Sequence, residues 1–143
     1  MEIVVTGVGP DGRSTLVDRQ DQATPDGAAP LGSVGLWHSA TWPPAVPPRP
    51  ADPGPPRDVR VGEGEAGWRY VWFGPDARVP AHWTDTVDFD TVLAGSVTLE
   101  LEDGAVDLVP GDMVVMNGVV HGWTAGPDGC VLGALLVGLP PRA

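Results

Sequence analysis

The sequence predicts an all-β fold on three observations. Its 143 residues include 20 glycines and 17 prolines, which leave little room for long helices. Valine, leucine, threonine and tryptophan recur in runs of strand length. These runs are short, evenly spaced and separated by glycine or turn residues, a pattern typical of a barrel or a sandwich. The length suits one domain, residues 1–143, built around one core.

The N-terminal residues 1–38 are predicted to form strands. The β-prone runs Glu2 to Thr6 and Ser14 to Asp18 flank a Gly-Pro-Asp-Gly turn at 9–12, which indicates a hairpin. Val34 to His38 is predicted to be a further strand.

Residues 39–66 form a proline-rich arm in this interpretation. Eight prolines lie between Trp42 and Pro56, and a central strand of that composition would lack ladder N–H groups. We expect an extended polyproline segment over the surface, or a partly mobile loop, that crosses the domain or helps to pack a dimer. Its PxxP pattern also matches ligands of proline-binding modules, which is the less favoured reading.

Residues 67–137 are predicted to be the barrel core. In the first strand Trp68, Tyr70 and Trp72 alternate with Arg69, Val71 and Phe73, so both faces are rich in apolar residues and we expect both to be covered. Further strands are predicted at 79–83, 88–93, 97–102, 106–109, 113–116, 121–124 and 130–137, separated by turns at 95, 103–104, 110–111, 117–118 and 126–127.

Charge and cysteine content narrow the possible partners. Eight basic against 19 acidic residues give a net charge of −11, which disfavours nucleic acid and anionic lipid surfaces. The single cysteine, Cys130, excludes an internal disulfide framework, and the N-terminal stretch lacks the features of a secretory signal, so a cytoplasmic location is expected. The longest apolar run, 131–139, is too short to span a bilayer, and no membrane role is expected.

The stretch from His82 to Trp123 holds two of the three histidines and several carboxylates. On one continuous strand, His82 and Asp88 would lie roughly 20 Å apart. They can meet only if the chain reverses between them, and residues 84–86 are the predicted place. His121 would have to arrive from a neighbouring strand.

Two motifs in this region resemble those of the cupin superfamily. The first motif of that family has glycine, His-x-His, an acidic residue and glycine, and the second has glycine, Pro-Gly and histidine. The corresponding residues here are Gly74, His82, Thr84, Asp88 and Gly95, then Gly104, Pro110, Gly111, Asp112 and His121. The resemblance implies a small single-domain cupin, a double-stranded β-helix barrel of jelly-roll type over 67–137, and a homodimer.

The chain departs from that pattern at two positions. Thr84 replaces the second histidine of the first motif, and Asp88 replaces the longer glutamate. The string H-x-T-x-T-x-D followed by H-x-W is similar to a cupin subgroup found in small-molecule metabolism, in which threonine is ordinary at that position.

The resemblance implies that His82, Asp88 and His121 are the metal ligands and catalytic residues. Two histidines and one carboxylate leave coordination positions open, which makes Fe²⁺ the first candidate and Zn²⁺, Mn²⁺ or Ni²⁺ the alternatives. Thr84 could hold a ligand water. Without a metal, the same residues could act as general acid and base.

Five residues are candidates for substrate binding: Thr84, Trp123, Tyr70, Trp72 and Asp90. Trp123 shares parity with His121 and would form a flat wall for an aromatic or polyketide-like substrate, or else a core side chain. Asp90 shares a face with Asp88 and could be a second carboxylate in the cavity, although a solvent-facing position is preferred. Tyr70 and Trp72 would line the cavity, or lie in the core or a dimer interface.

The expected function is that of a small-molecule enzyme, a metal-dependent lyase of the dehydratase, decarboxylase or cyclase kind. A metal would stabilise an enolate while a histidine moves the proton. An iron-dependent dioxygenase and a non-catalytic small-ligand binder are the alternatives. His38 is expected at the surface and Cys130 in a strand, and serine-nucleophile and phosphate-loop motifs are absent.

Overall fold

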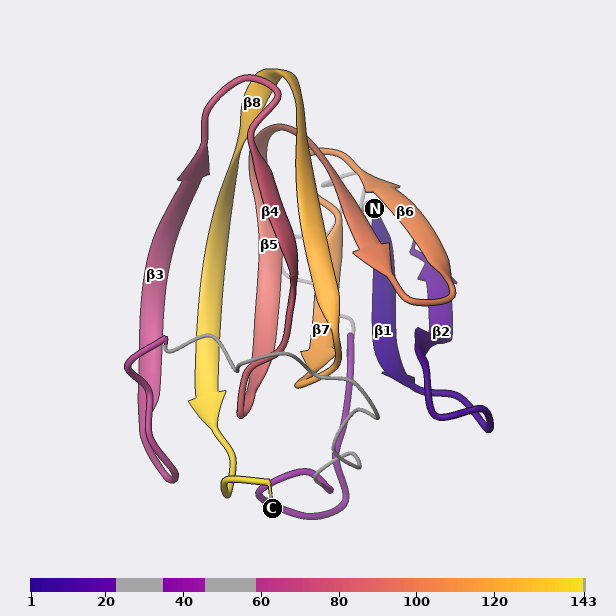
Figure 1. Cartoon of the computed structure of the whole chain (residues 1–143), viewed down its shortest axis with the longest axis vertical. Helices are drawn as coiled ribbons and strands as arrows, with labels where there is room; N and C mark the ends of the chain where they lie inside the picture. The colour runs from indigo at the N-terminus through magenta and orange to yellow at the C-terminus, as the bar shows by residue number, and fades with distance from the viewer. Residues whose placement is uncertain (23–34, 46–58, 143) are drawn as a thin grey trace, which may run out of the picture.

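The computed structural model describes residues 1–22, 35–45 and 59–142, and its regular elements are all strands (Figure 1). They are β1 Glu2–Val8, β2 Ser14–Asp21, β3 Ala66–Phe73, β4 Arg78–His82, β5 Thr86–Leu101, β6 Gly104–Leu108, β7 Met113–Asn117 and β8 His121–Gly138. The all-β prediction is confirmed. No helix that could cross a membrane occurs within the described ranges.

The N-terminal hairpin is confirmed, but the strand predicted at Val34 to His38 is not. β1 and β2 pair antiparallel, and β1 also pairs in parallel with β7, which joins the hairpin to the main sheet. Residues 35–38 form no strand, and Val34 lies outside the described residues. Trp37 instead packs its ring edge against Phe89, with centroids 5.3 Å apart, so this apolar segment attaches by side-chain packing without a backbone ladder.

The proline-rich arm was predicted for residues 39–66. Residues 46–58 lie outside the described residues, so the arm as a whole stays a prediction. At its C-terminal end Ala66 already belongs to β3.

β5 and β8 are long strands that bend together and so belong to two layers. The first part of β5 pairs with β7 and with the second part of β8, whereas its second part pairs with β6 and with the first part of β8. Register shifts at Val92/Ala94 and Gly95/Val97 mark the bend. The sequence predicted two separate strands in each case; the bulges instead let the ladder continue around the corner.

The bend folds one sheet into two facing layers. One layer has the strand order β2-β1-β7-β5-β8-β3, and the other is formed by β4, the first part of β8, the second part of β5, and β6 (Figure 1). The apolar side chains between the layers form the core, and they include Val92, Leu99, Leu108, Met116 and Leu132. The candidate site lies between these layers.

β3 is the end strand of its layer, and the expectation that both of its faces are covered is wrong. Trp68 is 87% exposed, and Tyr70 and Trp72 are also largely exposed, whereas Val71 and Phe73 pack against the core. The outward face of β3 therefore carries the larger aromatic side chains.

Replacing Gly95 with alanine tests the bend. Gly95 has a φ of 73°, and an added Cβ would lie 2.1 Å from the carbonyl oxygen of Gly129 on β8. Left-handed strain and this clash together predict a loss of about 3 kcal/mol in the free energy of unfolding, measured by urea denaturation.

Gly12→Ala is the matched control. Gly12 has a φ of 80° but nothing within 4 Å of an added Cβ, so only the backbone strain of about 1 kcal/mol should appear. Equal losses in the two variants would contradict a close strand approach at Gly95.

Candidate functional site

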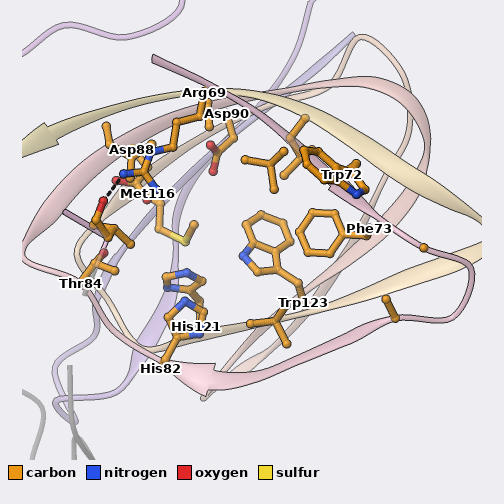
Figure 2. Close-up of a pocket in the computed structure, with 18 residues that line it drawn as sticks. Arg69, Trp72, Phe73, His82, Thr84, Asp88, Asp90, Met116, His121 and Trp123 are labelled. Atoms are coloured by element: carbon orange, nitrogen blue, oxygen red, sulfur yellow. Dashed lines mark hydrogen bonds between the residues drawn. The ribbon is translucent and has the colours of Figure 1, made fainter. Parts of the chain in front are cut away.

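A cavity of about 370 Å³ lies between the two layers and contains most of the predicted site residues (Figure 2). β3, β4, β5, β7 and β8 all contribute to its wall. Histidines occupy one part of the wall, and two aspartates with an arginine occupy another (Figure 2).

His82 and His121 come together because β4 pairs with β8 in a register that places the two residues opposite each other. Their ring centroids are 4.4 Å apart. The Nδ1 atom of His82 lies 2.9 Å from the carbonyl oxygen of Pro80, and that of His121 lies 2.8 Å from the carbonyl oxygen of Val119. Because a carbonyl oxygen only accepts, the Nδ1 atom of each ring carries a proton.

The predicted chain reversal after His82 is confirmed. β4 ends at His82 and β5 begins at Thr86, so the direction changes over residues 83–85. Thr84 is buried within this reversal and lines the cavity, and its hydroxyl accepts a hydrogen bond from Thr86 at 2.8 Å.

Asp88 and Asp90 follow on the inward face of β5, and both are buried at the cavity wall. The preferred sequence prediction of a solvent-facing Asp90 is therefore wrong, and the alternative of a second cavity carboxylate is right. This part of β5 lies between β7 and β8 in the sheet.

Burial dominates the protonation of both carboxyl groups. It raises the pKa of Asp88 to about 6, although a hydrogen bond from Thr86 and the Arg69 charge act in the opposite direction. Burial, and then the negative charge of Asp88, raise the pKa of Asp90 well above its usual value. The two carboxyl groups therefore both bind a proton more strongly than exposed aspartates do, and they titrate as a coupled pair.

One carboxylate oxygen of Asp88 lacks a hydrogen-bond donor within the described part of the chain. Oδ1 is buried, and no hydrogen-bond partner for it exists among the described residues. A buried carboxylate oxygen without a donor is costly, so a polar group entering the cavity would be stabilised there.

The metal-ligand set implied by the family resemblance is not assembled. In the described part of the chain no group of three or more His, Cys, Asp or Glu side chains could hold a metal ion. Met116 lies between Asp88 and the two histidines (Figure 2), and the positive charge nearest in effect to Asp88 is that of Arg69. His82, Asp88 and His121 share one cavity, but their geometry does not fit a common metal.

The predicted aromatic residues have different positions. Trp123 is buried, lines the cavity and lies edge-on to His121 at 5.9 Å, so both readings of it, wall and core, hold. Trp72 contributes to the cavity wall although it is 74% exposed, which places it at the rim. Tyr70 points outward and is not among the lining residues, contrary to the prediction.

Arg69 is a site residue that sequence reasoning missed. It lies on β3 between two outward aromatics, lines the cavity and donates a hydrogen bond to the carbonyl oxygen of Val59. Its charge lowers the pKa of Asp88. A single cation within an aromatic strand was the available signal, but alternation alone does not tell which face points inward.

Two residues outside the site match their predictions. His38 is exposed. Cys130 is a buried strand residue, and burial raises the pKa of its thiol, which opposes a role as a nucleophile.

No family model matches the chain. A curated relative, the Oryzines biosynthesis cluster protein J of Aspergillus oryzae, is 41% identical over 61 residues, which are 42% of this chain. The chain spans about one third of the length of that protein, 34%.

Similar solved structures include an RmlC-like cupin from Shewanella frigidimarina, with 19% identity, a TM-score of 0.46 and coverage of 51% of this chain and 66% of that one. KdgF from Halomonas sp. has 22% identity, a TM-score of 0.44 and coverage of 60% and 86%. The RmlC-like protein is described as a cupin, the superfamily that the sequence motifs resemble.

The buried Asp88 predicts a pH dependence of stability. With a pKa of about 6 in the folded protein and about 3.9 when unfolded, the unfolded chain loses this proton first as pH rises. The contribution of Asp88 to the free energy of unfolding should therefore fall by about 3 kcal/mol between pH 4 and pH 6, and Asp88→Asn should remove this part of the fall while the part that comes from Asp90 remains. Urea denaturation across this pH range measures it.

Asp107→Asn is the control for this measurement. Asp107 is exposed on β6, so the variant should keep the pH profile of the wild type. A wild-type profile that matched that of Asp88→Asn would show that Asp88 does not titrate in the predicted way.

Proposed function

We propose that the protein is a small-molecule enzyme of the cupin type that catalyses proton transfer in an elimination, as a lyase of the dehydratase kind. The unpartnered Oδ1 of Asp88 is the observation that carries this proposal, because it faces a cavity that also holds two basic imidazole nitrogens. A site that only stored an apolar ligand would gain nothing from a buried, unsatisfied carboxylate.

The side chains divide naturally into a base and an acid. The Nε2 atom of His82 or His121 removes a proton from the carbon next to a substrate carbonyl. The carboxyl of Asp90, whose pKa burial raises, donates a proton to the departing hydroxyl group, and water and an alkene form. Asp88 accepts a hydrogen bond from a substrate hydroxyl or amide and so orients it.

The cavity favours a small substrate with an apolar or aromatic part. Its volume of about 370 Å³ lies at the low end for drug-sized ligands. Trp123 and Phe73 provide an aromatic wall, with ring centroids 6.4 Å apart. The likeness to a protein from a biosynthesis cluster supports a metabolite of secondary metabolism as the substrate.

Turnover of β-hydroxy carbonyl compounds in D₂O tests this proposal. NMR should detect the alkene product and deuterium on the carbon next to the carbonyl. His82→Gln and His121→Gln should each lower the rate by at least about 100-fold, because each removes a candidate base or its neighbour.

His38→Gln is the matched control, since His38 is exposed and lies outside the site, and its rate should equal that of the wild type. Saturable binding of these compounds without product or deuterium would instead favour the non-catalytic ligand binder.

We also propose that two copies pair through the outward face of β3. Trp68, Tyr70 and Trp72 lie there with the exposed Leu93 and Leu135, and β3 is an end strand of its layer (Figure 1). This face exposes on the order of 600 Å² of apolar surface, which is large for a monomer. Pairing would bury about 1,200 Å², the lower end of stable interfaces.

Tyr70→Asp should prevent this pairing, because it places a charge at the centre of the apolar face. Sedimentation should find the wild type as a dimer and the variant as a monomer, while Val109→Asp, at another exposed apolar residue, should remain dimeric. A wild type that stays monomeric at high concentration would overturn the pairing.

A further inference from the structure

Arg142 is a buried cation that lies outside the cavity. Only 5% of its side chain is exposed, and it follows the last strand in sequence. Its guanidinium stacks over the ring of Trp83, 4.3 Å from the centroid. A buried arginine with this many partners is expensive to desolvate, so its contacts indicate what it holds in place.

The guanidinium joins two separate turns. Nε donates to Oδ1 of Asp85 at 2.8 Å, and Nη2 donates to the carbonyl oxygen of Thr84 at 2.7 Å, both within the reversal between β4 and β5. Nη1 donates to the carbonyl oxygen of Gly118 at 2.6 Å, in the connection between β7 and β8. Each of the three nitrogens thus holds a different backbone or carboxylate oxygen.

These two turns carry the two histidines. The first follows directly after His82, the last residue of β4, and the second leads into His121, the first residue of β8. Val119, next to Gly118, provides the carbonyl oxygen that orients the His121 ring. The three oxygens that Arg142 bonds therefore lie within three residues of one or the other histidine.

Glycine suits position 118, because the two turns approach closely there and the backbone is left-handed. Gly118 has a φ of 58°, and an added Cβ would lie 3.0 Å from the carbonyl oxygens of both Thr84 and Thr86. The backbone N–H of Leu139, a buried residue that follows β8, donates to the carbonyl oxygen of Asp85 at 2.8 Å. This bond also attaches the segment after β8 to the first turn.

We infer that Arg142 is a positioning residue that sets the separation of the His82 and His121 rings by clamping the turns on which they stand. It touches neither ring and acts only through the turns. The inference rests on the proposed function only in taking this histidine pair as the reacting groups. Its planar fork matters, because the guanidinium presents three separate nitrogens in one rigid plane and stacks on Trp83, whereas a lysine would have to reach all three oxygens from a single nitrogen.

The test is the NOE between the ring protons of His82 and His121 in protein with ¹³C-labelled histidine. The chain has three histidines, so single substitutions assign the signals. We expect the NOE in the wild type, its loss in Arg142→Ala and Arg142→Lys, and its return when guanidinium ion at a sub-denaturing concentration fills the gap in Arg142→Ala.

Arg78→Ala is the matched control. Arg78 lies on β4 with His82 and forms an ion pair with Glu100 at 3.2 Å, but its side chain is 71% exposed. The NOE should persist in this variant. If Arg142→Ala does not fold, Arg142→Lys decides. An NOE that persists in a folded Arg142 variant overturns the inference.

The turnover assay separates this inference from the proposed function. Loss of the NOE with a matching fall in kcat, and little change in KM, supports both. Loss of the NOE with unchanged turnover keeps the clamp and overturns the use of the histidine pair in the reaction.

Discussion

The shared bend of β5 and β8 is the constraint on which the rest of the structure depends. Because both strands bend at the same place, one continuous sheet folds into two facing layers that enclose a cavity. Gly95 and Gly129 make the corner possible, because both adopt positive φ and pack directly against backbone oxygens. The bend therefore brings the site residues of β5 and β8 together, although the residues that form the bend take no part in the proposed reaction.

The cavity contains two kinds of titratable side chain, imidazoles and carboxyl groups, and their surroundings differ. The imidazoles are oriented by backbone carbonyls, each of which accepts the Nδ1 proton of its ring. The carboxyls of Asp88 and Asp90 are instead held in poor solvation, which favours their protonated forms. Two imidazoles and two poorly solvated carboxyl groups thus share one cavity, and this arrangement makes acid–base chemistry the natural proposal.

Much of this arrangement could be predicted from the sequence, because it depended on local patterns. The hairpin turn, the reversal after His82 and the strand that carries Asp88 all followed from turn residues, distance limits and β-prone runs. Predictions that needed to know which neighbour covers a strand were less secure. Asp90 was expected to face solvent, and Tyr70 to face inward, because alternation defines two faces without saying which one is buried.

The sequence by itself determined the all-β class and the N-terminal hairpin, because turn chemistry and strand propensity act over a few residues, and its motifs pointed to His82, Asp88 and His121. Only the tertiary structure decided that Arg69 and Asp90 join the cavity, that Met116 lies between Asp88 and the histidines, and that Arg142 bridges their turns. Those contacts join residues far apart in the chain, and their geometry follows from the bend and register of the strands.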